Sequence, residues 1–226
     1  MTTGLPWWRQ LLKKVHPEGI PSPGTKLYNI LSASAIFQRH YELVAKDILG
    51  YCTQGHILDV GTGPGWLLLA IYKLCPSLKL TGLDVSPSMV ASARENLTKS
   101  GVKDGIDIVE GNASALPFPD ETFDLVVSTG AFHHWKAPVD GLNQIHRVLK
   151  PGRYALIYDL VSDTPKSILA ETTREFGRLK ALLFWLHSFE EPFYTGENFT
   201  SLAKSTLFKQ GSSRFVGVLC CLILKK

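Results

Sequence analysis

The chain has 226 residues, of which 45% are hydrophobic and 19% charged, and 24 basic side chains exceed 20 acidic ones for a net charge of +4. This length suits a single domain with a full core, and the ordinary apolar content with small net charge excludes low-complexity disorder. The longest apolar stretches, 66–72 and 216–224, fall short of the ~18 residues that a membrane span needs. The first residues show no basic-then-apolar leader pattern, so we expect no export.

Four cysteines, Cys52, Cys75, Cys220 and Cys221, have no spacing typical of a zinc site or a disulfide framework, so we expect neither a bound metal nor a disulfide. Cys220 and Cys221 are adjacent in a predicted strand, where neighbouring side chains point to opposite faces. We therefore expect small buried hydrophobic residues and a reducing, cytoplasmic location.

Residues 17–24 are rich in proline and glycine and predict a hinge, so that residues 1–24 form an N-terminal arm with its hinge. Beyond it, short apolar runs alternate with segments of helical spacing. The runs predict strands at 56–60, 78–83, 106–110, 123–128 and 154–159, and the helical segments lie at 66–74, 88–100 and 139–149. This alternation predicts an α/β fold, a doubly wound, mostly parallel sheet with helices on both faces.

The alternation stops after Leu160. Residues 161–196 have a helical, aromatic-rich pattern and predict a lid insertion, followed by a helix at 198–206. Residues 208–215 and 218–224 predict a hairpin that closes the sheet, which gives seven strands with an antiparallel C-terminal strand. We assign 25–226 to one domain.

A glycine-rich turn follows the first predicted strand, in the order Asp59-Val60-Gly61-Thr62-Gly63-Pro64-Gly65-Trp66. Glycines allow close approach of a ligand to the backbone, and a helix start offers free N–H groups. A dinucleotide fingerprint needs glycine at position 66, where this chain has Trp, and the lysine of a phosphate-binding loop is missing. Asp59 would repel phosphate but accept from an ammonium group. The pattern therefore predicts a nucleoside ligand with a positive tail, the alternative being a tight turn without a ligand.

A second acid, Asp84, follows the next predicted strand. An acid about 20 or more residues beyond a glycine turn is placed to accept hydrogen bonds from ribose hydroxyls. Asp84 can equally hold the start of the helix that Ser86-Pro87 predicts, and the two roles are compatible.

Four motifs in order closely resemble class I S-adenosylmethionine-dependent methyltransferases. They are Asp59-x-Gly61-x-Gly63-x-Gly65, then Asp84, then the stretch from Glu110 to Asp124, then Leu149-Lys150-Pro151-Gly152. Within this family the chain looks most like the small-molecule branch that includes the ubiquinone/menaquinone C-methyltransferases. The resemblance covers residues 28–160 and implies a Rossmann-like fold with S-adenosylmethionine as cofactor and S-adenosylhomocysteine as product.

The resemblance also implies roles for individual residues. Gly61, Thr62, Gly63 and Gly65 would line the methionine portion of the cofactor, with Asp59 near its amine. Asp84 would hold the ribose hydroxyls, Val85 and Met89 would contact adenine, and Asn112 would accept from the adenine amino group beside Ala113. Thr129 and Gly130 would face the sulfonium, and Tyr28 would cover the cofactor.

The family places its methyl acceptor at the loop after the fourth strand, here Ser128 to Trp135. His134 is our candidate proton acceptor, with His133 beside it, because imidazole titrates near neutral pH. In the alternative interpretation the pair shapes the pocket or bonds the backbone. This loop lacks the Asn/Asp-Pro-Pro-aromatic turn and the Pro-Cys pair of enzymes that methylate nucleic acid, so we expect no nucleic-acid partner.

The net charge is unevenly distributed: residues 51–160 carry 9 basic and 11 acidic groups, whereas both flanks are basic. Amphipathic patterns at 7–15 and 178–193 lie in those flanks. They either cover the core of a lid or form an apolar acceptor cavity, with the arm resting peripherally on a membrane surface.

We predict methyl transfer to a small apolar or aromatic acceptor. The alternative is a non-catalytic module that binds the cofactor or its product, and we predict no particular oligomeric state.

Overall fold

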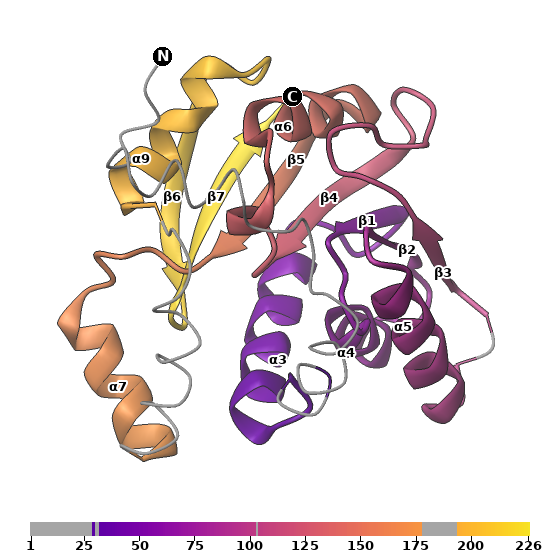
Figure 1. The fold of residues 1–226 in the computed structure, drawn as a ribbon, viewed down its shortest axis with the longest axis horizontal. Coiled ribbons are helices and arrows are strands. Elements are labelled where there is room, and N and C mark those ends of the chain that lie inside the picture. The colour runs from indigo at the N-terminus through magenta and orange to yellow at the C-terminus, as the bar shows by residue number, and fades with distance from the viewer. Residues whose placement is uncertain (1–28, 30–31, 103, 178–193) are drawn as a thin grey trace.

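The computed structural model describes residues 29, 32–102, 104–177 and 194–226, and their centre is a seven-stranded sheet of order β3-β2-β1-β4-β5-β7-β6 (Figure 1). The strands are β1 His56–Val60, β2 Lys79–Asp84, β3 Ile106–Glu110, β4 Phe123–Thr129, β5 Leu149–Asp159, β6 Gly211–Val216 and β7 Leu219–Lys225. β7 is antiparallel to both β5 and β6, and the pairs among β1 to β5 are parallel. The mostly parallel sheet with an antiparallel C-terminal strand is therefore confirmed.

Helices cover both faces of this sheet. Those in the described part are α3 Ala35–Leu49, α4 Trp66–Leu74, α5 Pro87–Lys99, α6 Pro138–Val148, α7 Lys166–Phe176 and α9 Gly196–Ser201, with short 3₁₀ turns η1 Phe132–His134 and η2 Leu202–Ser205. Helices α3, α4 and α5 share one buried apolar cluster with the sheet, and α6 and α9 share the other. The two clusters make this a three-layer α/β domain.

The chain reverses its winding at β1, which pairs with β2 on one side and β4 on the other. β1, β2 and β3 follow each other outward, and the chain then returns to place β4 against the free edge of β1. Such a switch point leaves a crevice at the carboxyl ends of the strands, which is where ligands bind in open α/β sheets.

Most predicted boundaries agree with the structure to within one residue, but the fifth strand begins five residues earlier than expected. β5 starts at Leu149 rather than Tyr154, because Leu149 pairs with Phe123 before the register shifts. The Lys-Pro-Gly stop signal lies inside this strand, where Gly152 has φ +74° and donates to the Lys226 carbonyl at 3.0 Å.

The predicted and observed elements also differ before the first strand and after the fifth. The predicted helix at 198–206 is α9 followed by η2, and the first hairpin strand begins at Gly211. The pattern analysis did not include α3, although buried residues at Ile36, His40, Val44 and Ile48 follow a helical period. Of the predicted lid, α7 is described, whereas 178–193 and the arm at 1–24 lie outside the described residues.

The adjacent cysteines confirm the strand prediction. Cys220 is buried in the cluster that includes α6, and Cys221 in the cluster that includes α3 and α4, so their side chains point to opposite faces of β7. Both thiols are free, and burial raises the pKa of each. In the described part of the chain, no helix is both long enough and apolar enough to cross a bilayer.

Candidate functional site

The glycine turn between β1 and α4 needs residues without a side chain. Gly61, Gly63 and Gly65 have φ values of +79°, +51° and +80°, which L residues rarely adopt. A Cβ on Gly61 would lie 2.4 Å from the Cβ of Ala131. The loop after β4 therefore packs directly on the turn, so the two segments border one site.

The end of β2 fixes the shape of this turn. The N–H groups of Gly61 and Thr62 donate to the Leu83 carbonyl at 2.7 and 3.0 Å. Asp84 accepts from the N–H of Gly63 at 2.8 Å through one carboxylate oxygen and from that of Ser86 at 2.9 Å through the other. Asp84 therefore ties the turn to the start of α5, and its oxygens keep lone pairs for further donors.

Asp59 is the penultimate residue of β1, near the switch point, and is 1% exposed. Burial raises its pKa to about 7; the Thr62 hydroxyl, which lies nearby without completing a hydrogen bond, opposes this rise, and the nearby charge of Asp84 adds to it. Burial likewise raises the pKa of Asp84, against the three backbone N–H groups that stabilise its charged form. Two buried acids at the carboxyl ends of neighbouring strands make a site that favours a positively charged ligand.

Unsatisfied polar atoms gather at the same edge. Four buried side-chain oxygens have no hydrogen-bond partner among the described residues: Asp59 Oδ1, Thr62 Oγ1, Ser128 Oγ and Thr129 Oγ1. They come from the ends of β1 and β4, which are paired at Asp59 and Val127. Buried polar groups are normally bonded, so these oxygens suit a ligand that brings hydrogen-bond donors. An ammonium and a nucleoside hydroxyl are suitable donors, and S-adenosylmethionine carries both, so the residues present fit that cofactor.

The remaining predicted site residues surround this edge. Gly130 has φ +62°, and no described atom lies within 4 Å of the position of a Cβ. Met89 is buried and Val85 half-buried at the start of α5. Gly111 donates to the Asp84 carbonyl at 3.0 Å and brings Asn112 and Ala113 beside β2. The Asn112 amide oxygen accepts from Ser114 at 2.8 Å. Tyr28 lies outside the described residues.

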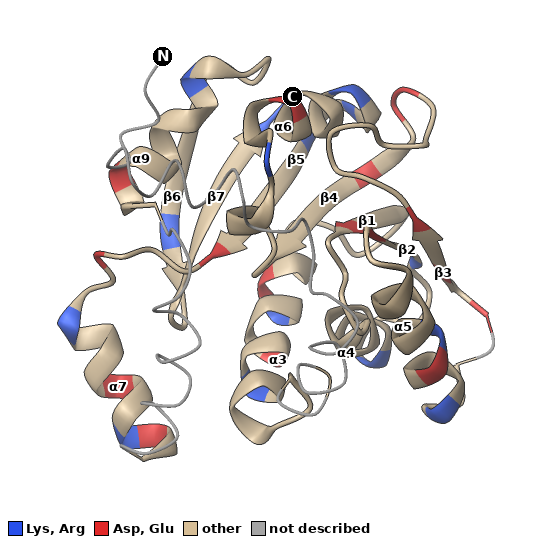
Figure 2. Cartoon of the chain, in the orientation of Figure 1, with Lys and Arg blue, Asp and Glu red and all other residues tan. Residues whose placement is uncertain are grey.

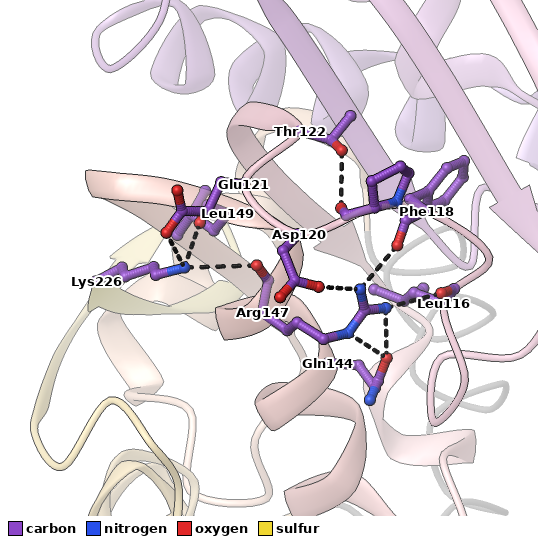
Figure 3. A network of polar contacts seen from close by, with 10 residues as sticks. Leu116, Phe118, Asp120, Glu121, Thr122, Gln144, Arg147, Leu149 and Lys226 are labelled. Carbon is purple, nitrogen blue, oxygen red and sulfur yellow. Dashed lines mark hydrogen bonds and ion pairs between the residues drawn. The ribbon is translucent and has the colours of Figure 1, made fainter.

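The loop after β3 is held in place by Arg147 of α6, a residue that motif reasoning did not select (Figure 3). Its guanidinium donates to the carbonyls of Phe118 and Leu116 at 2.8 and 2.9 Å and to Asp120 at 2.8 Å. Gln144 accepts two further hydrogen bonds from it. Because this loop carries Asn112, Arg147 sets the position of one wall of the site.

A second set of contacts joins the segment before α3 to the glycine turn. The buried Asn96 amide donates to the Pro64 carbonyl at 2.9 Å and to the Asn29 side chain at 3.1 Å. The indole N–H of Trp66 donates to the Ser32 hydroxyl at 3.1 Å. Trp66, whose identity excludes a dinucleotide turn, therefore anchors residues that precede the sheet.

The two histidines of η1 differ in their surroundings. His133 is buried, and its ring Nδ1 lies 2.8 Å from a carboxylate oxygen of Asp159, while its backbone N–H donates to the other oxygen at 2.9 Å. His134 is half-buried, and the two ring centroids are 4.1 Å apart. Sequence reasoning missed Asp159; its only local signal was an acid at the end of a predicted strand.

Comparison with known proteins identifies the family of the chain. A family model described as a methyltransferase domain matches residues 58–157. A demethylmenaquinone methyltransferase from Lactiplantibacillus plantarum is 30% identical over 199 residues, which cover 82% of this chain and 80% of the relative. A structure of an S-adenosylmethionine-dependent methyltransferase from Aquifex aeolicus has a TM-score of 0.67 at 20% identity and covers 92% of this chain and 99% of that one, which shows the fold.

A shorter match comes from Oryza sativa subsp. japonica. Its 2-methyl-6-phytyl-1,4-hydroquinone methyltransferase 1 is 38% identical over 108 residues, 48% of this chain. The chain spans 32% of the length of that relative. Taken with the sheet order and the glycine turn, these matches show that the chain belongs to the class I S-adenosylmethionine-dependent methyltransferases.

Replacing Arg147 with methionine should lower the free energy of unfolding by about 2–4 kcal/mol, because two part-buried carbonyls each lose a charged donor worth ~1–3 kcal/mol. Urea denaturation measures this. Arg174→Met on the exposed surface of α7 is the matched control, with an expected change within about 0.5 kcal/mol. Equal stability of the two variants would contradict the role given to Arg147.

The raised pKa of Asp59 predicts a pH-dependent stability of the cofactor-free protein. An unfolded aspartate titrates near pH 4 and Asp59 near 7, so the folded state holds its proton more tightly and loses this stabilisation as pH rises between those values, by at most ~1.4 kcal/mol per pH unit. Asp59→Asn removes this loss. Its free energy of unfolding relative to wild type should therefore increase from pH 5 to 7, whereas that of exposed Asp107→Asn should stay constant. A constant Asp59→Asn difference would rule out the raised pKa.

Proposed function

We propose that the protein transfers a methyl group from S-adenosylmethionine to a small, apolar aromatic acceptor of the hydroquinone class. The observation that carries the proposal is the cluster of buried oxygens at the glycine turn, which lack partners among the described residues. When bound, the cofactor supplies an electrophilic methyl group. The chain's own task is then to hold cofactor and acceptor in line, since alignment provides most of the rate in such displacements.

The residue roles follow from the chemistry of each group. Asp59 accepts from the cofactor amine, and Asp84 accepts from the ribose hydroxyls with the lone pairs that Gly63 and Ser86 leave open. Asn112 and Ala113 face adenine together with Val85 and Met89. Gly61, Thr62, Gly63 and Gly65 line the methionine portion, and Thr129 and Gly130 border the reacting centre. Tyr28 closes the site, and His133 and His134 serve the acceptor.

An apolar ring is the acceptor that best suits the loop after β4. Phe132 of this loop packs on Trp135, Phe199 and Tyr194, with ring centroids 4.9, 5.3 and 5.9 Å away. These buried rings hold the turn that also carries the two histidines. The matched relatives are named for demethylmenaquinone and for a phytyl hydroquinone, which are ring acceptors of this kind.

Small molecules suit the charge distribution better than nucleic acid does. Helices α3, α5 and α7 each carry residues of both signs (Figure 2). The described part of the chain thus presents mixed charges along these helices, whereas nucleic-acid binding calls for a stripe of basic residues. We therefore propose no nucleic-acid partner.

The first functional experiment supplies S-adenosylmethionine and a short-chain demethylated hydroquinone and detects the methylated product by mass spectrometry. Asp84→Ala removes the ribose acceptor and a support of the glycine turn, and hydrogen bonds to a charged group are worth ~1–3 kcal/mol each. Cofactor affinity measured by calorimetry should therefore fall at least tenfold.

Exposed Asp107→Asn on β3 is the control and should bind the cofactor as wild type does. Unaltered affinity in Asp84→Ala would contradict the cofactor placement. Normal cofactor binding without turnover on any hydroquinone would instead favour the non-catalytic binding module.

We further propose a cytoplasmic protein whose N-terminal arm rests on a membrane, where long-tailed quinones reside. Trp7 and Trp8 with nearby basic residues are typical of interfacial segments. Flotation with anionic vesicles should recover wild type, and Trp7→Ala/Trp8→Ala should remain in the dense fraction. Equal flotation of both proteins, or of neither, would exclude a membrane role for this arm.

A further inference from the structure

Asp159 stands at the carboxyl end of β5 and is 3% exposed. Its two oxygens accept from three groups: the backbone N–H of His133 at 2.9 Å, the backbone N–H of Leu160 at 2.8 Å, and the ring Nδ1 of His133 at 2.8 Å. The carboxylate therefore fixes both the backbone and the ring of His133.

This contact fixes the tautomer of His133. A carboxylate only accepts hydrogen bonds, so Nδ1 must carry the proton. In the neutral imidazole Nε2 then has the free electron pair and is the basic nitrogen. A carboxylate that orients a histidine in this way also stabilises the imidazolium that forms when Nε2 takes a proton.

The loop that carries His133 borders the cofactor site. Ala131 packs on Gly61 of the glycine turn, and the N–H of Gly130 donates to the Tyr158 carbonyl at 2.8 Å, one residue before Asp159. The ends of β4 and β5 are paired at Thr129 and Tyr158. Asp159 and His133 thus lie one strand away from the unsatisfied oxygens at the switch point.

We infer that Asp159 is a positioning residue that makes His133, rather than His134, the proton acceptor for the methyl acceptor, an inference that rests on the proposed function. In the step, the O–H bond of a hydroquinone breaks and an Nε2–H bond forms. The electron pair stays on the hydroxyl oxygen and the ring, and this anion is a better nucleophile than the neutral hydroquinone. A bond to the methyl carbon then forms as the bond between that carbon and the sulfonium sulfur breaks. If a ring carbon is methylated, the proton on that carbon is lost and the hydroxyl oxygen is protonated again. In either case one proton is released overall, and His133 is its first carrier.

The charges around His133 are consistent with a single proton carrier. Asp159 of β5 and His134 of η1 both contact the His133 ring, and the charge of Asp159 also reaches Tyr194 before α9. Burial and the charge of Asp159 raise the pKa of Tyr194 to about 12, so that hydroxyl stays neutral. An imidazolium at His133 is balanced by Asp159, whereas a second one at adjacent His134 would be repelled by the first.

The tautomer can be measured on the full chain without any acceptor. Long-range ¹H–¹⁵N correlation spectra of histidine-labelled protein, assigned with His133→Gln, should show His133 protonated at Nδ1. In Asp159→Asn the amide can donate to Nδ1, so the Nε2–H tautomer should appear. An Nε2–H tautomer at His133 in the wild type would overturn the inference, whether or not turnover is observed.

Kinetics provide the second measurement. Asp159→Asn should lower kcat on the hydroquinone about 100-fold or more, the usual worth of general base catalysis, with the cofactor Kd unchanged within about twofold. The acid limb of its pH profile should move to lower pH, because the imidazolium loses its counter-charge. Asp140→Asn on the exposed side of α6 is the matched control.

Two outcomes separate this inference from the proposed function. A greater loss of kcat in His134→Gln than in His133→Gln would assign the base to His134 and overturn the inference. Cofactor binding with an Nδ1–H tautomer but no turnover on hydroquinones would confirm the positioning by Asp159 and refute the acceptor class.

Discussion

The carboxylate of Asp84 is the contact on which the rest of the site depends. One oxygen holds the glycine turn through Gly63 and the other holds the start of α5 through Ser86. The backbone carbonyl of the same residue accepts from Gly111, which begins the loop with Asn112. A single residue at the end of β2 thus fixes three segments that are distant in sequence. Their relative positions follow from the sheet, because β2 is held between β1 and β3.

Much of this could be predicted from the sequence because its signals are local. Each signal lies within a few residues of the chain. This holds for the apolar runs of β1 and β3 and for the order Asp59-x-Gly61-x-Gly63-x-Gly65. The contacts that were missed join residues far apart in the chain: Arg147 reaches Leu116 and Phe118, and His133 reaches Asp159. No periodicity encodes such pairs, since they form only when two strands or a strand and a helix pack. The α3 helix is different, because its buried residues recur with a helical period that is visible in the sequence.

Three buried acids end neighbouring or nearly neighbouring strands, and the fold treats them differently. Asp84 and Asp159 receive backbone N–H groups on both oxygens, so each of these oxygens has a hydrogen-bond donor. Asp59 has an oxygen without a partner in the described residues and carries the highest cost of burial. A ligand that brings a positive charge offsets this cost. The charged form of Asp59 is therefore the least favourable in the cofactor-free protein, and a cationic cofactor would stabilise it most.

The opposite edge of the sheet shows that this arrangement is specific. Asp124, near the amino end of β4, is paired with Lys150 at 2.8 Å and Arg153 at 3.4 Å. Burial works against its charge, but Lys150, the His56 N–H and Arg153 outweigh it and lower its pKa. No lysine or arginine of the described chain forms an ion pair with Asp59, Asp84 or Asp159. Asp124 is thus neutralised by residues of the chain itself, and Asp159 contacts the His133 ring. Asp59 and Asp84 have no such partner among the described residues, which suits the cationic cofactor that we propose for the switch point.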